Sequence, residues 1–204
     1  LTAVMLRKVS DAEALEEAVA GAHAVVIGPA LGVAPVHREA VLAALRAPAR
    51  LVLDADVFTL FRDDSQALFD NLGVQDVMTP HVGEFNRAFP GLLTGAPNRI
   101  AAVKEASARA GAVVLLKGPD TVIAAPDGRC AVNGTGNAYL ATAGSGDVLA
   151  GIIAGLMAQG MESFSAASAA VWLHGRCGEA LGPGLIAEDL PGALPAVLRE
   201  VLQA

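Results

Sequence analysis

Short apolar runs alternate along the chain with longer segments in which apolar residues recur every three or four positions. The short runs are rich in β-branched residues and end at glycine, proline or aspartate, as strands do, whereas the longer segments are typical of helices. The predicted strands span residues 24–27, 50–53, 75–78, 113–117, 121–125 and 129–132. The predicted helices span residues 35–45, 83–89, 98–110, 147–160, 163–181 and 190–202, with a further helix before them that ends near residue 20.

Local signals set several of these boundaries. Ser10 and Glu13 have the spacing of a capping box and predict the start of the first helix. Pro35 is favourable at the first position of a helix. Residues 126–128, Pro-Asp-Gly, have the composition of a turn, so the last two strands are predicted to form a hairpin.

The strands before the hairpin are short and mostly apolar, as expected of parallel strands covered on both faces. The alternation of strands and helices predicts an α/β fold: a three-layer arrangement with a mostly parallel central sheet, helices on both faces and the antiparallel hairpin at one side. Residues 1–204 show no internal repeat and no linker, and we expect them to form one domain.

Composition excludes several classes of protein. Of the 204 residues 53% are apolar and 17% are charged, which excludes intrinsic disorder. The formal net charge of −7 disfavours general binding to nucleic acid or to an anionic membrane. The uncharged segment 148–161 is shorter than the roughly 20 residues that span a bilayer. Cys130 and Cys177 are too few for a disulfide scaffold and fit a reducing cytoplasm.

Glycine and polar residues gather where the predicted strands end. The carboxyl edge of an open parallel sheet is where ligands bind, so we expect a site there. The segments concerned are GPALG at 28–32, DAD at 54–56, TPHVGE at 79–84, KG at 117–118 and GSGD at 144–147.

The GSGD segment carries the strongest chemical signal, because Asp147 is the only charged residue between Cys130 and Met161. Gly144 and Gly146 at a helix start allow backbone N–H groups to bind an anion. A carboxylate beside that anion can accept a proton from a hydroxyl that attacks a phosphoryl group. The segment therefore predicts phosphoryl transfer, and the structural alternative is that Asp147 merely caps the helix. The chain contains neither a Walker loop nor a G-x-G-x-x-G motif after its first strand.

The sequence resembles the nucleotide-dependent NAD(P)H-hydrate dehydratases, a family of the ribokinase-like superfamily. The resemblance extends from about residue 25 to residue 198, and it is the combination of TPHVGEF with the GSGD string that distinguishes this family within the superfamily. The matching strings are GPALG (28–32), LDAD (53–56), TPHVGEF (79–85), LLKGPDTVIAAPDG (115–128), GTGN (134–137), ATAGSGDVLAGIIAGLMAQG (141–160), AVWLHG (170–175) and AEDL (187–190).

The resemblance implies repair of NADH or NADPH whose nicotinamide ring has taken up water. ADP or ATP donates a phosphoryl group to the ring hydroxyl, and phosphate, a better leaving group than hydroxide, is then eliminated. The resemblance further implies a cytoplasmic homotetramer. It also implies Mg²⁺ as a cofactor, with no residue assigned as a direct metal ligand. Asp54 and Glu84 could steer the ion through water, or they could hold neighbouring loops.

The resemblance also implies roles for individual residues. Asp147 would be the base, with Gly144 and Gly146 forming the anion hole. The phosphate donor would be bound by Lys117, Gly118, Pro119, Asp120, Thr121, Asn137 and Gly146. The hydrated dinucleotide would be bound by Gly32, His81 and Asp147.

Several of these residues have structural alternatives. Lys117 could be a solvated lysine at a strand end. His81 could be a loop histidine whose ring nitrogen is satisfied locally. Asp54 and Asp56 could cap the next helix. His174, in an apolar helix, is expected to be a packed core histidine and is assigned no role.

The sequence departs from the family pattern at three places. Ala30 stands where the family usually has a second glycine. Ala138 and Tyr139 replace a Pro-Gly pair, and the tyrosine could either crowd the site or stack on a base. The chain begins at Leu1, where family members normally continue toward the N-terminus with a strand, a glycine-rich turn and a helix, so we expect part of the substrate pocket to be missing.

Two other functions compete with the dehydratase. One is a different ribokinase-like enzyme that phosphorylates a small alcohol. It would share the Gly144–Asp147 segment but leave TPHVGEF unexplained. The other is a nucleotide-binding module without catalytic activity.

Overall fold

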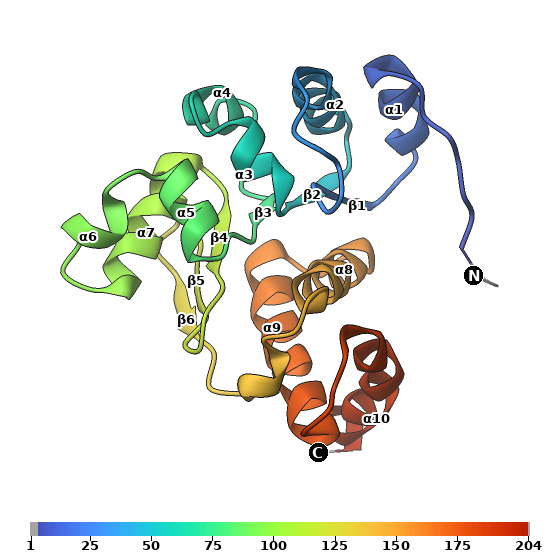
Figure 1. Ribbon diagram of the computed structural model, residues 1–204, viewed down its shortest axis with the longest axis vertical. Coiled ribbons are helices and arrows are strands. Elements are labelled where there is room, and N and C mark those ends of the chain that lie inside the picture. The colour runs from blue at the N-terminus through green and yellow to red at the C-terminus, as the bar shows by residue number, and fades with distance from the viewer. Residues whose placement is uncertain (1–3, 204) are drawn as a thin grey trace.

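The computed structural model describes residues 4–203 and contains a six-stranded sheet (Figure 1). The strands are β1 (Ala24–Ile27), β2 (Arg50–Leu53), β3 (Val77–Met78), β4 (Val113–Leu116), β5 (Val122–Ala124) and β6 (Cys130–Val132). They neighbour one another in chain order, with β1 to β4 parallel and the pairs β4–β5 and β5–β6 antiparallel. The predicted mostly parallel sheet with a hairpin at one side is confirmed.

Helices precede, separate and follow the strands. They are α1 (Ala12–Val19), α2 (Pro35–Arg46), α3 (Asp56–Leu60), α4 (Ser65–Phe69), α5 (Val82–Ala88), α6 (Leu92–Gly95), α7 (Arg99–Ala110), α8 (Ser145–Ala158), α9 (Ser163–Leu181) and α10 (Leu190–Gln203), with 3₁₀ turns η1 (Ala138–Leu140) and η2 (Ala187–Asp189). Every predicted helix is present. The prediction missed α3, α4 and α6, because a helix of four or five residues is too short to show a helical period.

The sheet has one apolar core on each face. Leu51 and Leu53 of β2 pack into the core formed with α2 to α5 and α7, whereas Val52 packs into the core formed with α8 and α9. Successive strand residues point to opposite faces, so a strand buried on both sides has to be apolar at every position. Figure 1 shows the two helical layers, with α10 packed outside α8 and α9.

Two local predictions need correction. The capping box of Ser10 and Glu13 is wrong, because Asp11 is the N-cap of α1 and its carboxylate accepts a hydrogen bond of 2.9 Å from the N–H of Ala14. The strand predicted at 75–78 begins only at Val77. At residue 76 the side chain bonds to β2 in place of the backbone, since the Asp76 carboxylate accepts the N–H groups of Leu51 (2.9 Å) and Gly73 (2.8 Å). Its carbonyl oxygen still accepts the N–H of Val113 over 3.0 Å.

The hairpin turn forms as its sequence predicts. Gly128 has a φ of +92°, which favours glycine, and its N–H donates to the carbonyl oxygen of Ala125 over 2.9 Å. Among residues 4–203, no helix is both long enough and apolar enough to cross a membrane.

Candidate active site

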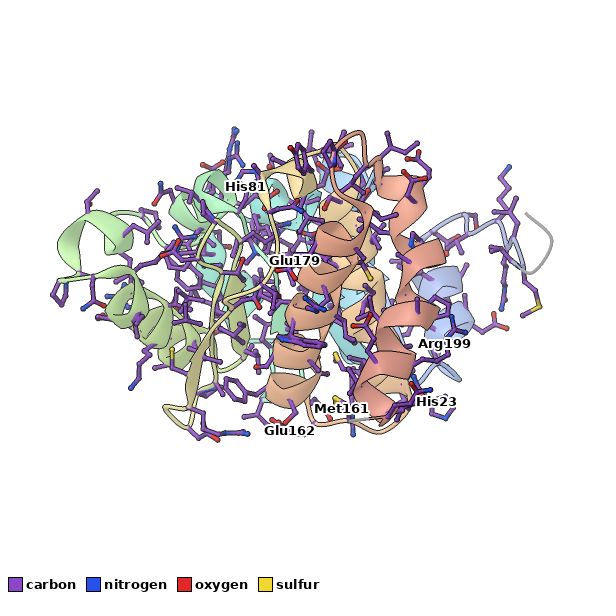
Figure 2. The ribbon with its side chains drawn as sticks, turned by 90° about the horizontal axis from the view of Figure 1, so that it is seen from below. His23, His81, Met161, Glu162, Glu179 and Arg199 are labelled. Atoms are coloured by element: carbon purple, nitrogen blue, oxygen red, sulfur yellow. The ribbon has the colours of Figure 1, made fainter. Side chains whose placement is uncertain are left out.

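The carboxyl ends of β2, β3 and β4 bring three of the predicted site segments together. Residues 81 and 117 form an isolated parallel bridge beyond the ends of β3 and β4, and the N–H of Lys117 donates to the carbonyl oxygen of Pro80 over 2.9 Å. In Figure 2, His81 marks this edge of the molecule, whereas His23, Met161 and Glu162 lie at the opposite edge. The expectation of a site at the carboxyl edge of the sheet therefore agrees with the fold.

Lys117 forms an ion pair with a buried carboxylate. Its Nζ donates to Oδ1 of Asp54 over 2.7 Å, and the side chains are 21% and 2% exposed. A carboxylate buried to that degree needs a partner, because an unpaired buried charge is strongly destabilising. Lys117 is therefore not a solvated lysine, and Asp54 does not cap α3, whose N-cap is Ala55 without a side-chain hydrogen bond.

Glu84 is a second buried carboxylate beside this pair. Its Oε2 lies 3.9 Å from Nζ of Lys117 and accepts the backbone N–H of His81 over 2.8 Å. Burial raises the pKa of the Glu84 carboxyl, and the hydrogen bond from His81 and the nearby Lys117 ammonium oppose that rise. The site thus contains one ammonium group flanked by two carboxylates.

His81 has a structural role in addition to its place at the site. Its Nδ1 accepts the N–H groups of Gly83 (2.9 Å) and Glu84 (3.3 Å), so the ring caps α5 and one nitrogen is satisfied locally, as the alternative interpretation expected. The ring is also half-exposed and lines a cavity. His81 is therefore satisfied locally through Nδ1, as a loop histidine would be, and is also placed where a ligand in the cavity could reach it.

The first turn of α8 faces the ion pair. Gly144 is the N-cap, with a φ of +83° and no side chain to bind the first amides. No hydrogen bond among residues 4–203 uses the N–H of Gly146 or Asp147. A Cβ atom on Gly146 would lie 3.3 Å from Nζ of Lys117. Free amides at a helix start beside an ammonium group form an anion-binding corner.

A cavity of about 750 Å³ adjoins this corner. It lies between the β4–β5 loop, the segment 133–142, the start of α8 and the middle of α9. Its lining residues are His81, Lys117, Gly118, Pro119, Thr121, Asn133, Thr135, Gly136, Asn137, Ala138, Leu140, Ala141, Thr142, Ser145, Gly146, Leu149, Val171, His174 and Gly175. A lining that combines polar groups, among them Lys117, with apolar side chains suits a ligand that has an anionic part and an apolar part.

Arg99, which the sequence analysis did not identify, supports the β4–β5 loop. Its Nη2 donates to the carbonyl oxygen of Lys117 over 2.9 Å, and its Nη1 lies 3.9 Å from Oδ1 of Asp120. A Cβ atom on Gly118 would lie 2.4 Å from Nη2 of Arg99, so a side chain there would displace the guanidinium group from its present position. The Thr121 hydroxyl closes the loop by donating to the carbonyl oxygen of Gly118 over 2.9 Å.

The segment 133–142 is fixed to α9 by side-chain hydrogen bonds. The Thr135 hydroxyl donates to the carbonyl oxygen of Trp172 (3.1 Å), and the Asn137 amide donates to that of Gly178 (2.8 Å). The N–H of Gly136 donates to Oε1 of Glu179 over 2.8 Å, which lowers the pKa of that carboxyl. This wall of the cavity therefore depends on α9.

His174 and Ser145 form a buried contact in the lining of the cavity. Nε2 of His174 lies 3.0 Å from both Oγ and the carbonyl oxygen of Ser145. Burial lowers the pKa of His174, so the ring is neutral near neutral pH. The ring is buried, as predicted for a packed histidine, but its contact with α8 was not predicted.

The structure brings together only part of the predicted site. Lys117, Gly118, Pro119, Thr121, Asn137, Gly146 and His81 line the cavity, whereas Gly144, Asp120, Asp147 and Gly32 do not. Gly32 lies beyond the end of β1, where its N–H donates to Oδ2 of Asp56 over 2.8 Å. Asp56 thus binds the Gly32 loop and is not an N-cap.

Asp147 is exposed, although the segment around it contains no other charged residue. It is the third residue of α8 and does not cap it. Ser145 and Leu149, one turn apart, face inward, so residue 147 points about 200° away from Ser145, toward solvent. Its carboxylate is therefore open to a substrate that approaches from outside the cavity.

The departures from the family pattern have structural counterparts. Ala30 has a φ of +53°, a conformation in which glycine is easier to accommodate. Tyr139 is half-exposed and does not line the cavity, so it does not crowd it. Within residues 4–203, no three His, Cys, Asp or Glu side chains are grouped so as to hold a metal ion.

The fold and this site define a class of ribokinase-like proteins. The chain is 30% identical to a ribokinase-like superfamily protein of Enterococcus faecalis, with a TM-score of 0.78 over 91% of this chain and 66% of the other. It is 32% identical to the ADP/ATP-dependent NAD(P)H-hydrate dehydratase of Bacillus subtilis co-crystallised with ATP and Mg²⁺. The TM-score is 0.73, over 91% of this chain and 69% of that one.

The family model of the NAD(P)H-hydrate dehydratases matches residues 1–196, so the chain belongs to that family. It is 39% identical to the bifunctional NAD(P)H-hydrate repair enzyme of Salinibacter ruber over 92% of its own length and 36% of that protein. It is 40% identical to the ADP-dependent (S)-NAD(P)H-hydrate dehydratase of Neisseria meningitidis, over 73% and 52% of the two chains. The chain thus spans about a third to a half of the length of these relatives.

Proposed function

We propose that this chain dehydrates hydrated NADH or NADPH with ADP or ATP as phosphoryl donor. The observation that carries the proposal is the anion-binding corner of Lys117 and Gly146 at a 750 Å³ cavity, in a chain that belongs to the dehydratase family. Relatives described as ADP-dependent, and a related structure that contains ATP and Mg²⁺, support a nucleotide as the ligand.

The donor nucleotide would occupy the cavity. The β4–β5 loop, Lys117 to Thr121, and Asn137 would bind it, with a phosphate group at the amides of Gly146 and Asp147 and the adenine against the apolar lining. The Lys117 ammonium, positioned by Asp54, adds a positive charge at that end. Transfer of a phosphoryl group needs this kind of fixed charge more than covalent help from the protein.

Asp147 would act as the base. The hydrated ring would approach the exposed side of α8, between Gly32, His81 and Asp147, and its hydroxyl oxygen would attack the terminal phosphoryl group while the Asp147 carboxylate accepts the hydroxyl proton. The bond between that phosphoryl group and the rest of ADP would break, and AMP would leave. Phosphate departs with the electron pair of the ring C–O bond, an adjacent carbon loses a proton, and the double bond of the reduced nicotinamide is restored.

Magnesium fits this site as a companion of the nucleotide. Asp54 is bound to Lys117, and Glu84 accepts a backbone N–H, so these two carboxylates would reach the ion through water. When bound, Mg²⁺ would neutralise phosphate charge.

Turnover of hydrated NADH in the presence of ADP and Mg²⁺ tests the proposal. We expect absorbance at the reduced-nicotinamide band to return, and Asp147→Asn to lower kcat by about a hundredfold or more while the Kd for ADP changes less than about threefold. A stable phosphorylated product would favour a different small-molecule kinase. ADP binding by wild type without any turnover would favour a non-catalytic module.

Three further expectations belong to the proposal: residues 1–204 as one domain, a homotetramer and a cytoplasmic location. The apolar composition is compatible with a buried subunit interface. Light scattering of the purified protein measures the assembly.

A further inference from the structure

Ser145 presents a buried hydroxyl group to the cavity. It is the first residue of α8, it is only 4% exposed, and it lies next to Gly146 in the anion-binding corner. A buried hydroxyl needs a hydrogen-bond acceptor for its hydrogen atom, because leaving it unpaired is costly. The position of that hydrogen follows from the contact with His174.

The contact fixes which ring nitrogen of His174 carries hydrogen. Nε2 lies 3.0 Å from the carbonyl oxygen of Ser145, and a carbonyl oxygen only accepts hydrogen bonds. Nε2 is therefore protonated and donates. Because burial lowers the pKa of His174, the ring is the neutral Nε2–H tautomer, without a proton on Nδ1.

This tautomer determines what the Ser145 hydroxyl can do. A protonated Nε2 has no lone pair, so Oγ of Ser145, also 3.0 Å away, receives part of the same N–H and cannot donate to the ring. Among residues 4–203, Oγ of Ser145 has no other hydrogen-bond partner. The O–H of Ser145 is thus left to donate to a group in the cavity.

We propose that Ser145 donates a hydrogen bond to a phosphate group of the bound nucleotide, and that His174 is the positioning residue that holds this hydroxyl as a donor. The inference rests on the proposed function, since it takes the cavity as the nucleotide site. The phosphate is then bound by the Ser145 hydroxyl of α8 as well as by Lys117 and the amides at the helix start. His174 of α9 holds that hydroxyl in place.

Binding of ADP and of adenosine separates phosphate recognition from the shape of the cavity. Ser145→Ala should weaken ADP binding about tenfold or more, as expected for loss of a hydrogen bond to a charged group, and leave adenosine binding within about threefold. His174→Leu should have the same effect. His174→Gln places an amide N–H where Nε2–H lies and should restore ADP affinity to within about threefold of wild type.

Ser163→Ala is the matched control. Ser163, the first residue of α9, is buried as Ser145 is, and its hydroxyl donates to the carbonyl oxygen of Gln75 over 2.6 Å. It does not line the cavity. It should lower stability without changing ADP or adenosine affinity. If His174→Leu does not fold, Ser145→Ala and His174→Gln decide the matter.

The outcomes distinguish this inference from the function on which it rests. Wild type that binds neither ADP nor ATP contradicts both. Wild type that binds ADP while Ser145→Ala binds it equally well overturns this inference alone. Equal weakening of ADP and adenosine, or failure of His174→Gln to restore binding, also overturns it, because the two residues would then only shape the cavity.

Discussion

Replacing a glycine inside a helix by alanine should change stability in opposite directions at Gly151 and Gly175. Gly151 lies within α8, and a Cβ atom there would meet no heavy atom within 4 Å. Alanine favours the helix over glycine by about 1 kcal/mol. For a chain of this size, Gly151→Ala should therefore raise Tm by roughly 2–4 °C.

Gly175 lies within α9 and has the same intrinsic gain, but a Cβ atom there would lie 2.2 Å from Oγ1 of Thr135 and 2.8 Å from its carbonyl carbon. The segment at Thr135 would have to move away from α9. Overpacking of this kind costs about 1–3 kcal/mol, and the hydrogen bond from Thr135 to Trp172 is worth about 1 kcal/mol. After the gain of about 1 kcal/mol in helix preference is subtracted from these two costs, Gly175→Ala should destabilise the protein by about 2 kcal/mol. That loss should lower Tm by roughly 4–8 °C.

Thermal and urea unfolding of both variants measure these differences, and ADP binding gives a second readout. Thr135 and Gly136 line the cavity, so Gly175→Ala should weaken ADP binding, whereas Gly151→Ala should leave it unchanged. If Gly175→Ala stabilised the protein as Gly151→Ala does, the docking of this segment on α9 would contribute nothing to stability, contrary to the prediction.

Two further predictions concern Ala55 and His174. Ala55 has a φ of +51° and a ψ of −112°, so Ala55→Gly should relieve strain and stabilise the protein by about 1 kcal/mol, and a lower Tm in that variant would contradict this. Burial lowers the pKa of His174 below its ordinary value of 6.5, so as pH falls the ring takes up a proton more readily in the unfolded chain than in the folded one. The free energy of unfolding therefore decreases as pH drops below about 6.5. His174→Gln lacks this proton, so its stability relative to wild type should improve between about pH 7 and pH 5; a constant difference across that range would count against a buried neutral ring.

Much of the secondary structure follows from local pattern. The apolar runs 51–53 and 113–116 predicted buried strands, and β2 and β4 formed there because both faces of the sheet are covered. The short helices α3, α4 and α6 could not be predicted, since the packing of the connections against the core decides them. The start of β3 could not be predicted either, because the side chain of Asp76, and not its backbone, accepts the N–H of Leu51 in β2.

The candidate site was only partly accessible from the sequence. Polar residues at strand ends indicated Lys117, because the carboxyl ends of parallel strands meet at one edge. Glycines at a predicted helix start indicated Gly146. The exposure of Asp147 could not be predicted from local pattern, because it depends on which face of α8 packs inward. Arg99 carried no signal, since its role lies in contacts with a loop that begins 18 residues later.

Local pattern was enough to predict the order of strands and helices, the edge of the sheet that carries polar groups and the family to which the chain belongs. Which of those groups meet depends on how the elements pack. Lys117 finds Asp54 63 positions earlier in the chain, and His174 finds Ser145 29 positions earlier. Such pairings arise because packing of whole elements sets the distance between distant residues, and a local pattern contains no information about that distance.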